Sequence, residues 1–179
     1  MHSDLQRILG DRLVLEPLGL DHFSDVRHLH CRALATPALD ALSEEEIQAF
    51  LGLVRSPAYS DLLVREQLYG ARFDGELVGT ASWQGTGGAG AAARIGSVFV
   101  RHQRLGIGRW LVGEVEQRAV QAGFRRFTVY ATAGAVPFFE RLGYGAVSRG
   151  IKTFSAECAL PVTFLRKELP AEARPSRLM

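Results

Sequence analysis

The chain has 179 residues, and 21 Lys and Arg against 19 Asp and Glu give it a formal net charge of +2. This length predicts one domain, and 47% hydrophobic with 22% charged residues excludes disorder throughout. The small charge argues against a nucleic-acid-binding or membrane-surface protein. No apolar run approaches the roughly 18 residues of a membrane span. Two cysteines, Cys31 and Cys158, are too few for a disulfide framework or zinc site, so we expect a cytoplasmic protein without a metal.

The N-terminal half shows, in order, a strand, two helices, a loop and a hairpin. The second helix has the clearest beginning, because Ser43 and Glu46 form a capping box and Ile47 starts an apolar stripe. Asp74-Gly75 is a two-residue turn typical of a β-hairpin. The expected ranges are 12–17 for the strand, 21–34 and 43–54 for the helices, 55–61 for the loop, and 69–73 and 76–83 for the hairpin strands.

The C-terminal half alternates strands and helices. Gly123 is placed to end the longer helix, and the glycine-rich segment 85–90 is expected to be a mobile loop. The order predicts a mixed sheet in one α/β domain. The expected ranges are 93–100, 127–131, 145–153 and 158–167 for the strands, and 107–122 and 135–142 for the helices.

The turn between strand 93–100 and the next helix is the most informative segment. It reads QRLGIGR over 103–109. Its glycines allow a tight turn, and the free N–H groups and dipole of the helix, together with three nearby arginines, suit a phosphate or pyrophosphate. A Rossmann fingerprint is excluded because Leu111 stands where its third glycine would be. A P-loop is excluded because no Gly-Lys-Ser/Thr follows.

The segment 103–108 resembles the Gln/Arg-x-x-Gly-x-Gly/Ala turn of the GCN5-related N-acetyltransferases at every defined position. A second stretch, AVPFFERLGY over 135–144, is similar to the family's later motif, in which an alanine and an aromatic pair precede leucine, glycine and an aromatic residue. One helix and one strand separate the two motifs, as in the family. The resemblance implies a single α/β domain over 11–169, with 1–10 as an N-terminal extension and 170–179 as a frayed tail. Its mixed sheet would have about seven strands, splayed centrally and flanked by about four helices.

This resemblance implies transfer of an acetyl group from acetyl-CoA to a primary amine of a small molecule, peptide or protein, and it allows a homodimer. The backbone of 96–98 would pair with the pantetheine arm, and an N–H near Val98 would polarise the thioester carbonyl. The turn would wrap the pyrophosphate, two aromatic rings would pack against the arm, and a threonine would lie nearby. The implied cofactor-binding residues are Gly96, Ser97, Val98, Gln103, Arg104, Leu105, Gly106, Ile107, Gly108, Arg109, Thr132, Phe138 and Phe139.

The catalytic residues are where the sequence departs from the family. An amine of pKa ~10.4 needs a base at neutral pH. The family's tyrosine acid aligns with Phe139, and neither strand 93–100 nor strand 126–131 contains Asp or Glu. The missing tyrosine leaves two functions open, an N-acetyltransferase and a non-catalytic acyl-CoA-binding sensor or interaction module. The candidate proton carriers are Tyr130, Tyr59, Glu66 and His102.

Other polar and aromatic residues are expected to have structural roles. His28 and His30 lie two residues apart on a helix and so point to different faces, which favours solvated side chains over metal ligands. Trp83, Phe99 and Tyr144 are expected in the core.

Overall fold

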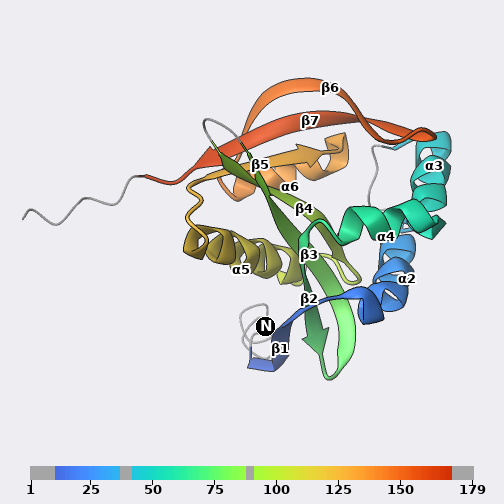
Figure 1. The fold of residues 1–179 in the computed structure, drawn as a ribbon, viewed down its shortest axis with the longest axis horizontal. Helices are drawn as coiled ribbons and strands as arrows, with labels where there is room; N and C mark the ends of the chain where they lie inside the picture. Colours follow the sequence, from blue (N-terminus) through green and yellow to red (C-terminus); the bar gives the residue numbers. More distant parts are fainter. Residues whose placement is uncertain (1–10, 37–41, 88–90, 171–179) are drawn as a thin grey trace, which may run out of the picture.

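A computed structural model describes residues 11–36, 42–87 and 91–170. It contains a seven-stranded mixed sheet in the order β1-β2-β3-β4-β5-β7-β6 (Figure 1). The strands are β1 Leu13–Pro17, β2 Gln67–Phe73, β3 Glu76–Thr86, β4 Ala92–Val100, β5 Arg126–Ala131, β6 Gly145–Ser155 and β7 Cys158–Glu168. The helices are α2 Phe23–Leu34, α3 Glu44–Arg55, α4 Pro57–Leu63, α5 Ile107–Gln121 and α6 Val136–Arg141, with 3-10 turns η1 Leu20–His22 and η2 Ala133–Ala135. None of the described helices is long and apolar enough to cross a membrane.

Two apolar cores lie on opposite faces of this sheet. Leu111 and Val115 of α5 are fully buried against the central strands, and α6 adds Phe139 to the same core. On the other face, Val26 of α2 and Val54 of α3 are fully buried, together with residues of α4 and β7. The predicted fold class, a splayed mixed sheet of about seven strands in a single α/β domain, is confirmed, and the part of the chain that the structure describes contains the five helices listed above, where about four were expected.

The predicted loop over 55–61 is wrong. α3 ends at Arg55, and α4 begins at Pro57 after the single residue Ser56. Ser56 has the extended backbone of an N-cap, and proline at the first helical position already has a helical φ. The serine and proline therefore mark a boundary between two helices. In the predicted loop over 85–90, Gly85 and Thr86 belong to β3, while 88–90 lie outside the described residues.

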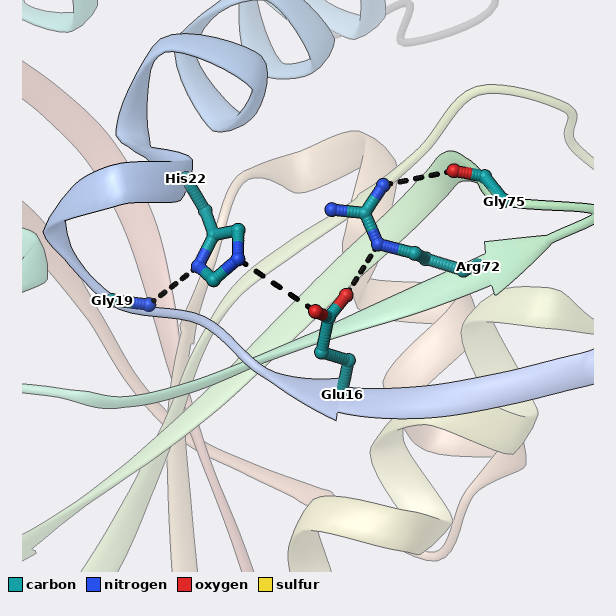
Figure 2. Close-up of polar contacts among 5 residues, drawn as sticks. All are labelled: Glu16, Gly19, His22, Arg72 and Gly75. Carbon is teal, nitrogen blue, oxygen red and sulfur yellow. Dashed lines mark hydrogen bonds and ion pairs between the residues drawn. The ribbon is translucent and has the colours of Figure 1, made fainter.

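A polar cluster joins the end of β1 to the β2–β3 hairpin (Figure 2). Glu16 forms an ion pair with Arg72, which also donates to the carbonyl oxygen of Gly75 at 3.0 Å. The N–H of Gly19 donates to Nδ1 of His22 at 3.0 Å, and the other ring nitrogen lies 3.6 Å from Glu16. These contacts hold the chain just before α2.

Candidate active site

The strands β4 and β5 diverge after a short parallel pairing (Figure 1). Ala93–Ile95 pairs with Phe127–Val129, and beyond Ile95 β4 stays paired with β3 while β5 stays paired with β7. Beyond Ile95, the side of β4 that faces away from β3 has no strand partner among the described residues, and this unpaired stretch between β4 and β5 is here called the gap. Backbone groups of Gly96–Val100 along this edge of β4 can therefore pair with an extended ligand.

The turn after β4 begins the 15-residue helix α5. Arg104 and Gly106 both have a left-handed backbone, with φ of +67° and +81°, and Gly106 is the N-cap. Trp110 donates the first backbone bond of the helix, to the carbonyl oxygen of Gly106 at 3.0 Å. The N–H groups before Trp110 have no partner within the helix, so they can bind an anion. Arg104 and Arg109 are exposed at this turn, whereas Arg101 forms an ion pair with Glu76.

Helix α6 packs beside the start of α5. A Cβ on Gly108 would lie 3.4 Å from the Phe138 ring, so the glycine allows the two elements to approach closely. Phe139 points into the core at 5% exposure, with ring contacts to Phe138 and Tyr144. Thr132 is partly buried and is the N-cap of η2 between β5 and α6.

A bulge in β4 lies immediately beyond the last pairing with β5. Thr80 pairs with Phe99 and Ser82 pairs with Gly96, so two residues of β4 oppose one of β3. Ser97, one of those two, has φ +50°, a conformation that costs a non-glycine residue about 1–3 kcal/mol. Neighbouring groups must therefore hold Ser97 in place.

Glu66, between α4 and β2, is one of these neighbours. The Ser97 hydroxyl donates to its Oε2 at 2.6 Å, and its Oε1 would lie 3.6 Å from a Cβ on Gly96. Burial raises the pKa of Glu66, and hydrogen bonds from Ser97 and Ser82 and the charge of Arg94 oppose this shift only in part. The structure thus brings a predicted proton carrier to the point where β4 leaves β5, and a carboxyl with a raised pKa suits proton transfer near neutral pH.

The other three predicted proton carriers lie in different surroundings. Tyr59 is 5% exposed, its hydroxyl lies 2.6 Å from Nδ1 of His30, and burial raises its pKa. His102 is exposed in the turn after β4. Tyr130 is 39% exposed on β5, with its ring against Phe164 and beneath the ammonium group of Lys152. Among the described residues, no three His, Cys, Asp or Glu side chains come together as a potential metal site.

The prediction that His30 is solvated is wrong, and Thr80 and Ser82 at the bulge were not predicted from the sequence. His30 is fully buried between α2 and the sheet. A signal for its burial was present, because His30 follows Phe23 and Val26 at helical spacing and precedes Ala33, on the apolar stripe of α2. Tyr144 is buried as predicted, whereas Trp83 and Phe99 pack against the cores while partly exposed.

Three partly exposed rings from different elements meet on the α2 side of the sheet. Phe99 of β4 lies 6.2 Å from Phe50 of α3, which lies 5.9 Å from Phe154 of β6, all measured between ring centroids. The end of the β6–β7 hairpin therefore contacts α3, as Figure 1 also shows. These three rings, here called the aromatic wall, form an apolar surface that begins two residues after Ser97 on β4.

The model of the acetyltransferase (GNAT) domain matches residues 38–154 of this chain. The chain belongs to this acetyltransferase family. A curated relative, the uncharacterized N-acetyltransferase YjcF of Bacillus subtilis (strain 168), is 33% identical over 89 residues. That match covers 49% of this chain and 63% of YjcF, so it spans less than two thirds of the relative's length.

Solved structures of GNAT proteins share this fold at low sequence identity. The crystal structure of a GCN5-related N-acetyltransferase from Rhodopseudomonas palustris has a TM-score of 0.74 at 21% identity, covering 87% of this chain and 95% of that one. The PaiA N-acetyltransferase of Thermoplasma acidophilum, solved in complex with coenzyme A, has a TM-score of 0.68 at 14% identity, covering 88% and 99%. These likenesses concern the fold alone.

Proposed function

We propose that this GNAT protein transfers an acetyl group from acetyl-CoA to a primary amine. The observation that carries the proposal is the hydrogen-bonded pair of Ser97 and Glu66 at the point where β4 parts from β5. This position combines a free strand edge for the acyl donor with a carboxylate that can accept a proton. Family membership and the fold of the coenzyme A complex of PaiA support the choice of donor.

The chain's residues fit coenzyme A along this gap. The edge of β4 at Gly96, Ser97 and Val98 offers backbone groups to the amides of the pantetheine arm. The left-handed turn and the free N–H groups at the start of α5 suit the pyrophosphate. Phe138 would contact the arm, with Phe139 supporting its ring from the core, and Thr132 would lie near the arm. The residues of the turn are Gln103, Arg104, Leu105, Gly106, Ile107, Gly108 and Arg109.

Proton transfer follows from the hydrogen bond between Ser97 and Glu66. Acetyl-CoA, when bound, supplies a thioester whose C–S bond breaks as the C–N bond of the product forms. The Ser97 hydroxyl accepts the proton lost by the amine and passes its own proton to the Glu66 carboxylate. Phe139 has no acidic proton, so the departing sulfur, a thiolate of pKa about 8.5, takes its proton from solvent.

The surroundings of Glu66 support one class of acceptor. One carboxylate suits one ammonium group, and its charged neighbour Arg94 is a cation, which disfavours a polyamine. The aromatic wall offers apolar contact to the rest of the acceptor. We therefore expect the preferred acceptor to be a primary amine with an apolar body, either free or at a peptide terminus.

Thiol release from acetyl-CoA tests the proposal, with phenethylamine, spermidine, a lysine peptide and a peptide with an apolar N-terminal residue as acceptors. Turnover should be highest with phenethylamine or the apolar peptide terminus. A thermal-shift titration with coenzyme A runs in parallel. A melting temperature that does not change at millimolar coenzyme A contradicts the proposal. A shift without turnover on any amine instead favours an acyl-CoA-binding sensor, the alternative that the absence of a hydroxyl on Phe139 supports.

A further inference from the structure

A buried chain of hydrogen bonds leads from α4 to the bulge in β4. His30 of α2 is fully buried, with Nδ1 2.6 Å from the Tyr59 hydroxyl and Nε2 2.7 Å from Oγ1 of Thr80. The Thr80 hydroxyl donates to the carbonyl oxygen of Ser97 at 2.7 Å. The His30 ring also stacks on Phe99, with ring centroids 4.0 Å apart. The proposed proton transfer from Ser97 to Glu66 uses none of the three side chains of Tyr59, His30 and Thr80.

The chemistry of the groups decides which of them donates in each hydrogen bond from Tyr59 to Ser97. A threonine hydroxyl has one proton, and Thr80 uses it on Ser97, so Thr80 must accept a hydrogen bond from Nε2 of His30. Burial lowers the pKa of His30 to about 3, so the neutral ring has its only proton on Nε2. Nδ1 then accepts from Tyr59, whose phenol burial keeps protonated. All the bonds point toward Ser97, and each donor in the chain is used once.

The last bond of this chain fixes one peptide group. The peptide between Ser97 and Val98 is planar and trans, so its C=O and N–H point in opposite directions. Because the C=O points to the Thr80 hydroxyl, the opposed N–H of Val98 is directed away from Thr80, and Val98 has no backbone partner on β3, so we place this N–H on the side of the gap. The Ser97 side chain is held separately by Glu66, so two independent hydrogen bonds hold the left-handed residue.

We propose that Tyr59, His30 and Thr80 are positioning residues that hold the Ser97–Val98 peptide so that the Val98 N–H faces the acetyl carbonyl of the bound donor. The inference rests on the proposed acetyl transfer. It assigns a role to side chains of α2, α4 and β3 that act on the donor only through the Ser97–Val98 peptide. Coenzyme A lacks the acetyl carbonyl, so loss of these hydrogen bonds should lower turnover and weaken binding of acetyl-CoA more than binding of coenzyme A.

The hydrogen-bond directions can be tested without any activity. Two-dimensional ¹H–¹⁵N NMR of the ¹⁵N-histidine-labelled chain reports the tautomer of each ring. His30, assigned by the loss of its signals in His30→Asn, should show a neutral ring protonated on Nε2 throughout the range from pH 5 to 8. A ring protonated on Nδ1, or one that titrates in this range, would overturn the inference.

The kinetic test uses Thr80→Val, which removes the hydroxyl and keeps the shape of the side chain. We expect kcat to fall at least tenfold, because the Ser97 carbonyl loses its hydrogen bond from Thr80. The preference for binding acetyl-CoA over coenzyme A should fall as well. The KM of the amine should stay within about twofold of wild type, and the Kd of coenzyme A should rise less than the Kd of acetyl-CoA. Thr80→Ser should restore kcat, and Thr128→Val, the same change at a buried residue of β5, should leave it unchanged.

Melting curves show that each variant is folded, and Tyr59→Phe provides a second test farther along the chain. It should lower kcat less than Thr80→Val, because His30 and Thr80 still separate it from the peptide. If Thr80→Val is folded and keeps both kcat and the preference for acetyl-CoA, the positioning role is wrong even though acetyl transfer stands. If the wild-type protein shows no turnover, the proposed function fails. The NMR result still tests the direction of the hydrogen bonds from Tyr59 to Ser97.

Discussion

Glu66→Gln removes the proposed proton acceptor while keeping the size of the side chain. The carboxamide oxygen of the substituted side chain can still accept a hydrogen bond from Ser97, so the bulge in β4 should keep its shape. An amide, however, cannot take up a proton near neutral pH. The variant therefore separates proton transfer from the structural role of the contact.

The size of the loss follows from the chemistry of the acceptor. A positioned general base contributes about 10²–10⁴-fold, and with a single serine between base and amine we expect a loss of about 10²–10³-fold in kcat/KM at pH 7. An amine of pKa ~10.4 is neutral in about one molecule in 2,500 at pH 7 and in roughly one in nine at pH 9.5. Because bulk solvent deprotonates far more amine at the higher pH, the deficit should shrink to about tenfold or less there.

The assay is initial-rate thiol release between pH 6 and 9.5, with Glu116→Gln as the control. Glu116 of α5 is also a partly buried glutamate, but it binds Lys167 and the Tyr144 hydroxyl instead of the bulge. Its replacement should lower stability and leave kcat within about twofold of wild type. The wild-type rate should rise with pH as Glu66 loses its proton. Because burial raises the pKa of Glu66, this rise should come at a higher pH than for an exposed glutamate. If Glu66→Gln keeps the wild-type kcat/KM, or loses the same factor at every pH, then Glu66 does not take up the proton.

The stability of Glu66→Gln gives an independent measure of the same environment. Burial raises the pKa of Glu66, so the folded chain holds its proton more tightly than the unfolded chain. The ionised carboxylate therefore destabilises the fold above the folded pKa, and this cost disappears as pH falls toward the unfolded value. Glu66→Gln should thus unfold at higher denaturant than wild type near pH 7.5, with an advantage that narrows as the solution is acidified. An advantage that grows on acidification would contradict the direction of the shift.

Three further predictions concern single residues of the site. Ser97→Ala should lose nearly as much kcat/KM as Glu66→Gln. The double variant should lose little more, because both changes break the same proposed proton path. Additive losses of the two single changes would exclude that path. Gly106→Val should weaken coenzyme A binding at least tenfold in calorimetry, because valine is strained at φ +81°. Gly113→Ala, on the exposed side of the same helix with no atom within 4 Å of the new Cβ, should keep that affinity and gain about 1 kcal/mol in denaturant unfolding. Phe139→Tyr should keep kcat but lower stability by about 1–3 kcal/mol, because its hydroxyl enters a buried ring cluster; a large loss of kcat at full stability would give Phe139 a role that its burial does not suggest.

Most of the fold could be predicted because the signals that define it are local. The capping box of Ser43 and Glu46 forms as expected, and the Asp74-Gly75 turn joins β2 to β3. The boundary at Ser56 was missed because serine and proline occur both in loops and at helix starts. The residues after Pro57 distinguish a loop from a helix, and α4 is too short for them to show a clear apolar period.

The backbone part of the site could be predicted for the same reason. The turn at 103–108 is continuous in sequence, and its glycine and helix start are visible without a structure. The proposed proton path could not be predicted in this way, because Glu66 and Ser97 are 31 residues apart and meet only when α4 and β2 pack across β3 onto β4. No local pattern encodes that contact, which is why Glu66 was one of four candidates.

His30 shows how a periodic pattern and residue chemistry can point in opposite directions. Its position on the apolar stripe of α2 indicated burial, while the imidazole indicated solvent, and the tertiary structure resolves the conflict by giving both nitrogens a partner. A buried histidine with two hydrogen bonds fixes the distance between α2, α4 and β3 more narrowly than a leucine could, because each bond has a direction as well as a length. The left-handed backbone of Ser97 is unfavourable for a non-glycine residue, so neighbouring hydrogen bonds must hold it in this conformation. The buried histidine and the strained residue at the gap are therefore linked by one series of hydrogen bonds, and a substitution as distant as Tyr59 can change the backbone at Ser97.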